Sequence, residues 1–316
     1  MKATFRQFIR EASVGEDLSP KILSEDEALR VIRENCSDVI DLFLQDHNFF
    51  KGFSADPLGK SEVFGVIDTN RTTRKSQNTA NFYTLVLDYK AKETGFPLRS
   101  KSLIGTTYSG TAESYGRRGG KFIMLPFNGS KIGFVGKPDI WEIPVKFMGM
   151  KFHTHSVSYF LNNDLGIPDT DISQIEKYQT LMRDKESVEF GKFVYAVTVE
   201  YGLFHFPYAV VRGLRNLFPN FSDTDNLGKM GLEIFRNHLT DDQKQHVKDL
   251  SSSLVDSVMD VFDHDSLGMK WKSTSNLSSS DMSEESEVWI QGKILMMRVL
   301  DHTSHSKFIE KLKGRK

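Results

Sequence analysis

The chain has 316 residues, a formal charge of −1 and a hydrophobic fraction of 39%. That composition suffices for one large domain or two ordinary ones, and the near-zero charge gives no global indication of binding to nucleic acid or a membrane surface. One cysteine excludes an internal disulfide, and no apolar run approaches the ~20 residues of a transmembrane helix. We therefore expect a soluble protein, with Cys36 as a buried structural thiol within a helix.

The first 13 residues are basic and amphipathic, with Phe5, Phe8 and Ile9 at helical spacing. They lack the apolar centre of roughly 7–15 residues that a secretory signal needs. By themselves they suit an ordinary first helical turn or a frayed end.

This segment also resembles the capsid-targeting peptide of internal head proteins in T-even-like tailed phages. Such peptides begin with Met-Lys, continue with an aromatic residue and a Phe-Ile pair, and end at Glu-Ala. The prohead protease of these phages cuts after Glu in an Ile/Leu-x-Glu pattern, which residues 9–11 match. The resemblance implies cleavage between Glu11 and Ala12, a location inside the phage head, and injection with the DNA into the host cytoplasm.

Helix and strand signals alternate irregularly in the first half of the chain. Ser24 and Glu27 form a capping box that opens a predicted helix ending near Asp46. Runs at 49–53 and 63–67 predict strands. A polar, basic stretch at 71–79 precedes a predicted helix that Asn78 or Thr79 caps and that ends near Lys92.

The next segment predicts a strand at 102–107, a short helix at 109–115, and two strands at 122–126 and 131–135. Asn128-Gly129 between the last two apolar runs is a strong hairpin signal. Residues 49–141 therefore predict an α+β pattern of short strands and small helices.

Helical periodicity dominates from about 142 to 262, most clearly in the pieces 172–182, 227–239 and 243–262. The apolar run 194–199 suits either a buried strand or a helix. A serine-rich stretch at 273–281 predicts a mobile linker or surface loop.

That loop leads to Glu285 and Glu287, immediately before an apolar strand pattern. Residues i and i+2 of an extended chain point to the same face, roughly 6–7 Å apart. Two carboxylates side by side in a cleft would suit cationic or electron-poor chemistry. Two solvated glutamates in an acidic loop are the alternative.

Three separate segments follow one another along the chain: 49–53 (Phe-Phe-Lys-Gly-Phe), 102–116 (with Gly-Thr-Thr at 105–107) and 285–292 (Glu-Ser-Glu-Val-Trp-Ile-Gln-Gly). They resemble the aromatic-Arg-Gly strand, the Ser-Thr-Ser strand and the Glu-x-Glu strand of ADP-ribosyltransferases. The resemblance implies a core of short antiparallel strands in two small packed sheets, from 12–141 and 273–316, with a mostly helical insertion at 142–272.

The resemblance also implies a chemistry: cleavage of the nicotinamide–ribose bond of NAD and transfer of ADP-ribose to a side chain of a host protein, arginine being the acceptor that a Glu-x-Glu motif favours. Glu287 would stabilise the cationic ribose, Glu285 would orient or deprotonate the acceptor, and Thr106 would hydrogen-bond Glu287. The loop 273–284 would contact the acceptor.

The cofactor-binding residues implied by the same resemblance are Lys51, Arg71 and Arg74, as contacts to the pyrophosphate of NAD. Gly105 and Thr107 take the first and last positions of the hydroxyl motif. Lysine is a point charge, whereas the arginine of the family offers a planar fork for phosphate.

These departures keep two other hypotheses open: a catalytically inactive internal head protein that binds or inhibits a host factor or DNA, and a structural component of the head. The lysine-rich end at 307–316 suits a solvated helix with a weak contact to packaged DNA. We expect no metal site, because His153 and His155 lack a carboxylate or cysteine at ligand spacing. We expect no membrane partner.

Cleavage after Glu11 is directly testable. Removal of the first 11 residues takes away three basic residues and one acidic residue, so the formal charge changes from −1 to −3. We expect the intact mass of the protein from phage particles to correspond to a chain that begins at Ala12. A particle-derived protein that retains the first 11 residues would contradict the capsid-targeting interpretation.

Overall fold

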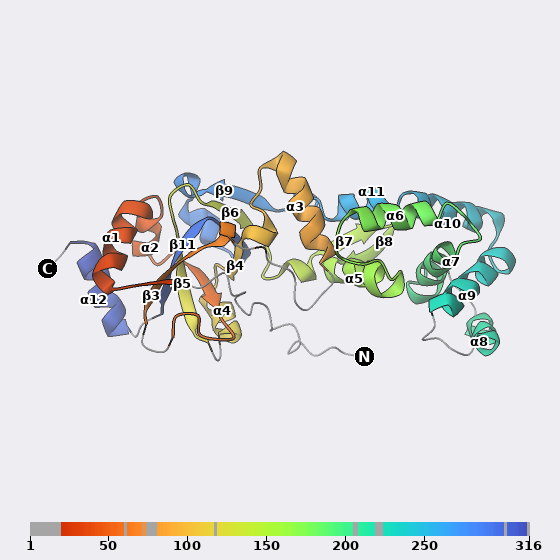
Figure 1. Cartoon of the computed structure of the whole chain (residues 1–316), viewed down its shortest axis with the longest axis horizontal. Helices are drawn as coiled ribbons and strands as arrows, with labels where there is room; N and C mark the ends of the chain where they lie inside the picture. Colours follow the sequence, from red (N-terminus) through yellow and green to blue (C-terminus); the bar gives the residue numbers. More distant parts are fainter. Residues whose placement is uncertain are drawn as a thin grey trace. The chain divides into compact units, whose positions relative to one another are not determined.

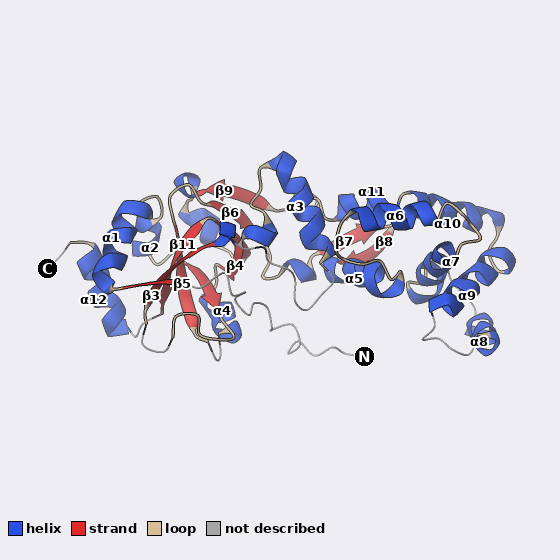
Figure 2. Cartoon of the chain, viewed as in Figure 1, coloured by secondary structure: helices blue, strands red, loops and turns tan. Residues whose placement is uncertain are grey.

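The structure is a computed structural model, and it describes residues 20–59, 62–71, 73, 81–116, 119–204, 208–218, 224–299 and 302–314. The described chain divides into two compact units. Unit 1 takes its residues from 20–73, 87–140 and 264–314, and unit 2 from 81–86 and 141–263. Figures 1 and 2 show that strands dominate unit 1 and helices dominate unit 2. The fold class is α+β, as the sequence predicts.

Unit 1 is built on one antiparallel sheet of nine strands in the order β1-β3-β11-β5-β2-β4-β10-β6-β9. Its strands are β1 (Lys21–Leu23), β2 (Phe49–Gly52), β3 (Phe64–Asp68), β4 (Leu103–Thr106), β5 (Lys121–Pro126), β6 (Lys131–Phe134), β9 (Lys270–Ser273), β10 (Glu287–Gln291) and β11 (Lys293–Arg298).

The sheet folds over itself between β2 and β4. These two strands share a single register pair, Phe50 with Thr106, whereas other neighbours in the sheet share three to five. The rings of Phe49 on β2 and Phe134 on β6 lie 6.1 Å apart, although three strand spacings of ~4.8 Å would place a flat sheet's β2 and β6 about 14 Å apart. The expected two packed sheets are therefore one continuous sheet whose two parts face each other.

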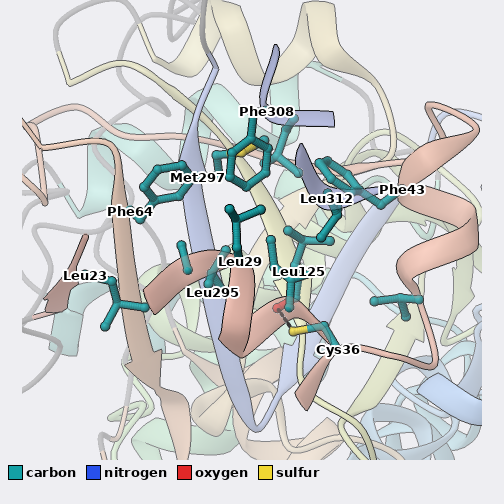
Figure 3. Close-up of a cluster of buried hydrophobic side chains, with 14 residues drawn as sticks. Leu23, Leu29, Cys36, Phe43, Phe64, Leu125, Leu295, Met297, Phe308 and Leu312 are labelled. Atoms are coloured by element: carbon teal, nitrogen blue, oxygen red, sulfur yellow. Dashed lines mark hydrogen bonds between the residues drawn. The ribbon is translucent and has the colours of Figure 1, made fainter. Parts of the chain in front are cut away.

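Side chains alternate across β5 and β11, and both faces are apolar. Ile123, Leu125, Leu295 and Met297 join one core cluster. Their neighbours on the same strands, among them Met124, join a second cluster that includes residues of β4, β6 and β10. The first core is covered by α1 (Glu25–Asn35), α2 (Ile40–Leu44) and α12 (His302–Leu312), and Figure 3 shows the residues that fill it.

The capping box of Ser24 and Glu27 is confirmed at the start of α1. The single helix expected to reach Asp46 is wrong, because the chain leaves the helix at 36–39 and restarts as α2. The Asn128 side chain accepts a hydrogen bond from the Asp38 N–H (3.0 Å) and donates one to the Ser37 hydroxyl (2.9 Å). A tertiary contact thus interrupts a continuous amphipathic pattern.

The predicted hairpin at Asn128-Gly129 is also wrong. The tight turn exists, since Gly129 has φ +79° and the Ser130 N–H donates to the Phe127 carbonyl (3.0 Å), but β5 and β6 do not pair with each other. β5 pairs with β11 and β2, whereas β6 pairs with β10 and β9. The turn therefore crosses from one part of the folded sheet to the other, and so does Gly292 between β10 and β11, which packs against Ser130.

Other predicted elements of unit 1 form close to their expected places. Strands occur at β2, β3 and β4, and α4 (Ser109–Tyr115) has the predicted bounds. The serine-rich segment 273–281 is not simply a linker: it starts in edge strand β9 and continues through 3₁₀ turns, where Asp281 accepts from Ser278 and pairs with Lys272 (2.7 Å). α3 spans Phe82–Thr94, and the caps expected at Asn78 and Thr79 lie outside the described residues.

Unit 2 contains one hairpin, β7 (Pro144–Phe147) with β8 (Met150–His153), and a set of helices. The run 194–199 is helical, and the pattern 243–262 forms two helices that separate at Ser253. The helices are α5 (Thr154–Tyr159), α6 (Ser173–Leu181), α7 (Val188–Tyr195), α8 (Tyr208–Leu217), α9 (Thr224–Asn237), α10 (Asp241–Ser252) and α11 (Leu254–Val261), with π-helical turns η6 (Phe160–Asp164) and η7 (Ala196–Glu200).

Helices α7 and α9 cross with their backbones in contact. A Cβ placed on Gly231 of α9 would overlap the backbone of Gly191 of α7, whose own Cβ would meet Gly228. Only glycine permits this approach, because any side chain would force the helices apart.

We expect Gly231→Ala to lower the free energy of unfolding by about 3 kcal/mol or more, since overpacking against backbone cannot relax easily. Gly213→Ala in α8 is the matched control, because a Cβ there meets no atom within 4 Å. It should be neutral or stabilising by about 0.5–1 kcal/mol. Urea denaturation measures both, and equal stability of the two variants would contradict the proposed packing.

Candidate active site at the ends of β4 and β10

The hydroxyl strand and the glutamate strand are direct neighbours. Glu287, the first residue of β10, is paired in register with Thr106, the last residue of β4. The pairing continues beyond the strand ends, where the Thr107 N–H donates to the Ser286 carbonyl (3.0 Å) and the Ser286 N–H donates to Thr107 Oγ1 (2.9 Å). Two motifs that are 180 residues apart in the sequence therefore meet at one end of the sheet.

The carboxylate of Glu287 is enclosed by three donors. The Trp289 indole N–H donates to Oε1 (2.6 Å), the Ile140 N–H donates to Oε2 (3.1 Å), and the Arg99 guanidinium lies 3.5 Å from Oε1. Glu287 is 6% exposed and Arg99 is 2% exposed. The guanidinium also lies over the Trp289 ring, 5.3 Å from its centroid. The arrangement is a buried, hydrogen-bonded ion pair.

Two local features create this arrangement. Glu287 and Trp289 are two positions apart on β10 and therefore share a face, and Gly133 on the neighbouring β6 leaves space beside the indole. Arg99 lies in the 3₁₀ turn η4 (Arg99–Lys101), just before β4. Isolated burial of a charge is costly, so the pair with Arg99 and the two neutral donors are what permit a carboxylate here.

Thr106 does not take its expected role. Its hydroxyl oxygen accepts from the Tyr108 N–H (3.1 Å), and within the described part of the chain it makes no hydrogen bond to Glu287. Gly105 stands where the family has a serine, and a Cβ there would overlap the Phe50 carbonyl of β2 and the Met124 side chain. The close approach of β2 explains the glycine.

Glu285 lies in a different environment from Glu287. It is exposed, and its carboxylate accepts a hydrogen bond from the Thr111 hydroxyl of α4. The Thr107 hydroxyl donates to the Glu284 carbonyl (2.6 Å), which fastens this loop to the end of β4. Nearby on α4, Ser109 accepts from the Lys121 ammonium (2.8 Å). Glu285 is thus the carboxylate that a bound molecule can reach.

The predicted phosphate contacts do not gather around the two glutamates. Lys51 is 8% exposed and follows Phe50, the register partner of Thr106, so it faces the opposite side of the sheet. Its ammonium lies 5.8 Å from the centroid of the Phe53 ring. Arg71 pairs with Asp68 (3.5 Å) in a turn that hydrogen-bonds to Gly292. Gly292 follows the last residue of β10, and Glu287 is the first residue of that strand, so Arg71 lies at the opposite end of β10 from Glu287.

Three expected residues lie outside the part that the structure describes: Arg74 at the cofactor site, and Glu11 and Ala12 at the cleavage site. Sequence reasoning missed Arg99 and Trp289. The i, i+2 spacing of Glu287 and Trp289 predicts that they share a face, but a lone arginine after Pro97 carries no such signal.

Other candidate groups have structural explanations. Cys36 is fully buried, its thiol lies 3.8 Å from the Leu125 carbonyl, and burial raises its pKa to about 12, so it is a structural thiol as expected. His155 Nδ1 lies 3.0 Å from the Trp141 carbonyl, and its ring stacks on that of His153. Across the described ranges, no group of three or more His, Cys, Asp or Glu side chains is placed to hold a metal ion, and no helix is long and apolar enough to cross a membrane.

Comparison with known proteins gives no match to a family, to a curated protein or to a solved structure.

The ion pair predicts a specific pattern of stability. Arg99→Met leaves Glu287 buried without its cation, so we expect the free energy of unfolding to fall by about 3–5 kcal/mol. The double variant Arg99→Met, Glu287→Gln removes both charges and should recover part of that loss. Urea denaturation of the single and double variants measures the coupling, and a loss below about 1 kcal/mol for Arg99→Met would contradict the burial of the pair.

Proposed function

We propose that this protein is an NAD-dependent ADP-ribosyltransferase that is packaged in a phage head and modifies a host protein after injection. The observation that carries the proposal is the register pair of Thr106 and Glu287, which joins the hydroxyl strand to the Glu-x-Glu strand. The antiparallel sheet with two parts packed face to face supports an ADP-ribosyltransferase-like core. The amino-terminal resemblance supports the route of delivery.

The reaction breaks the bond between C1′ of the ribose and the nicotinamide nitrogen. The bonding electrons leave with neutral nicotinamide, and positive charge develops on the ribose ring. The acceptor side chain then forms a new bond to C1′ and loses a proton. One carboxylate must stabilise the cation and one must orient the acceptor or take its proton.

We propose different tasks for the two carboxylates because their surroundings differ. Glu285 is exposed at the end of the sheet, so it is placed to receive the proton of an acceptor such as a guanidinium, while Thr111 fixes its carboxylate. Glu287 is held in one orientation by Trp289 and Ile140, which preorganises its charge. Because Arg99 offsets that charge, Glu287 reaches the ribose cation only if substrate binding loosens the ion pair.

The phosphates of NAD need cations that the expected residues supply only in part. Lys121 is 20% exposed at its side chain and bonds both Ser109 and Glu113 of α4, close in sequence to Thr111. We include it as a contact to the pyrophosphate in place of Lys51, which faces the opposite side of the sheet.

A second candidate function is a non-enzymatic relative that keeps the fold and binds a host factor or DNA. The enclosure of Glu287 favours it, since a carboxylate at 6% exposure with three donors serves stability without any substrate. Lys51 and Arg71 lie away from the two glutamates, which also favours the non-enzymatic candidate.

Labelled NAD and host lysate separate the two candidates. For the transferase, we expect the trimmed protein to label a host protein and to release nicotinamide. Glu285→Gln should lower the rate by at least about 100-fold, the usual contribution of a positioned acid–base group. Glu287→Gln should also abolish transfer, with circular dichroism used to establish that the variant is folded.

Glu284→Gln is the matched control, because Glu284 is exposed and contributes only its backbone carbonyl to Thr107. Its rate should stay within about twofold of the unmodified protein. Full activity in Glu287→Gln would refute the two-carboxylate mechanism. Absence of labelling and of nicotinamide release from the unmodified protein would favour the non-enzymatic candidate.

A further inference from the structure

Two helices of unit 2 end in the same unusual way. α5 widens into the π-helical turn η6 and α7 into η7, and each turn is followed by one residue and then a glycine with positive φ, Gly166 (+71°) and Gly202 (+66°). Each turn is closed by the same two backbone hydrogen bonds. At η6, the Leu165 N–H donates to the Phe160 carbonyl (3.0 Å) and the Ile167 N–H donates to the Leu161 carbonyl (3.0 Å). At η7, the Tyr201 N–H donates to the Ala196 carbonyl (3.0 Å) and the Leu203 N–H donates to the Val197 carbonyl (2.9 Å).

The last residue of each π-helical turn is acidic: Asp164 in η6 and Glu200 in η7. Both line one cavity of about 350 Å³, together with Lys192, Tyr195, Arg215 and Leu227. That volume lies within the range of small-molecule sites, roughly 300–1,000 Å³. π-helical turns are rare and occur often at functional sites, and here two of them present equivalent acids to one space.

The surroundings of Asp164 disfavour its ionised form. Burial and, to a smaller extent, the neighbouring charge of Glu200 raise the pKa of Asp164 to about 6, although the Tyr201 hydroxyl, which donates to Oδ2 (2.7 Å), lowers it. Burial raises the pKa of Tyr201 as well, so the pair offers a carboxylate and a neutral phenol.

The two basic residues that line the cavity are Lys192 and Arg215. Arg215 and Glu200 both hydrogen-bond the Tyr195 phenol, and their effects on its pKa are opposite, while burial raises that pKa. Asp164 therefore faces the cavity as an acid without a counter-ion among the described residues.

We infer that this cavity binds a small molecule with a guanidinium group, which is held by the carboxylates of Asp164 and Glu200. A cation between the two acids offsets their mutual repulsion and the cost of burying Asp164. The Lys192 ammonium favours a ligand whose other end is anionic or neutral. This inference stands independently of the transferase proposal, because every residue it uses lies in unit 2.

The affinity of such a ligand must depend on pH. The raised pKa means that Asp164 is largely protonated at pH 5 and ionised at pH 7.5, and a cationic ligand favours the ionised form. Binding should therefore strengthen as the pH rises through about 6. If the ionised carboxylate is required, the dissociation constant at pH 5.0 is about tenfold larger than at pH 7.5.

Arginine and citrulline are matched probes, because citrulline replaces the guanidinium with a neutral urea of the same shape. In calorimetric titrations of the full chain at pH 7.5, we expect arginine to bind at least about tenfold more tightly than citrulline. Asp164→Asn should weaken arginine binding by a similar factor and remove its pH dependence. Glu176→Gln in α6 is the control, since Glu176 is exposed, lies outside the cavity lining and loses the same charge.

Equal binding of arginine and citrulline, or no binding of arginine at millimolar concentration, would overturn the inference. So would tighter binding of inorganic phosphate than of arginine, since phosphate would be bound by Lys192 and Arg215 instead of the acids. The comparison of the two probes and of the two pH values uses the unmodified protein, so the inference remains falsifiable even if Asp164→Asn fails to fold.

Discussion

Strands β5 and β11 are apolar on both faces, and this constraint organises unit 1. One face is covered by α1, α2 and α12, as the cluster in Figure 3 shows. The other face needs an equally apolar cover, and the chain supplies it by folding the same sheet over at the single β2–β4 pair. Burial of two opposed faces thus explains why adjacent strands along the chain, β5 with β6 and β10 with β11, diverge instead of pairing.

The fold-over also decides what surrounds the glutamates. β10 lies between β4 and β6, so its inner side chains enter the core while Glu287 and Trp289 occupy the outer face. There the turn that carries Arg99 closes over them. Two carboxylates that are two positions apart in the sequence consequently have different roles: Glu287 contributes to the stability of the sheet, whereas Glu285 is open to a ligand. A transferase with this site would combine the buried carboxylate of Glu287 with the exposed carboxylate of Glu285.

Unit 2 obtains its polar cavity by a different route. Two helices end in matched π-helical turns, and each places an acid at the same position relative to its glycine. The wide turn redirects the side chain of the last residue, so Asp164 and Glu200 face one space although their helices are separate. Neither acid belongs to the motif that resembles a transferase, and the cavity therefore adds a binding capacity of its own to the chain.

The sequence by itself determined the local elements: the capping box at Ser24, the strands β2, β3 and β4, the helix α4 and the buried Cys36 all follow from spacing and residue type. It also placed Glu285 and Glu287 at a strand end. Only the tertiary structure decided which strands pair, because the Asn128-Gly129 turn is compatible with a hairpin or a crossover and the burial of both faces of β5 selects the crossover. It likewise chose Arg99 as the partner of Glu287, since a contact between residues so distant in sequence leaves no periodic signal.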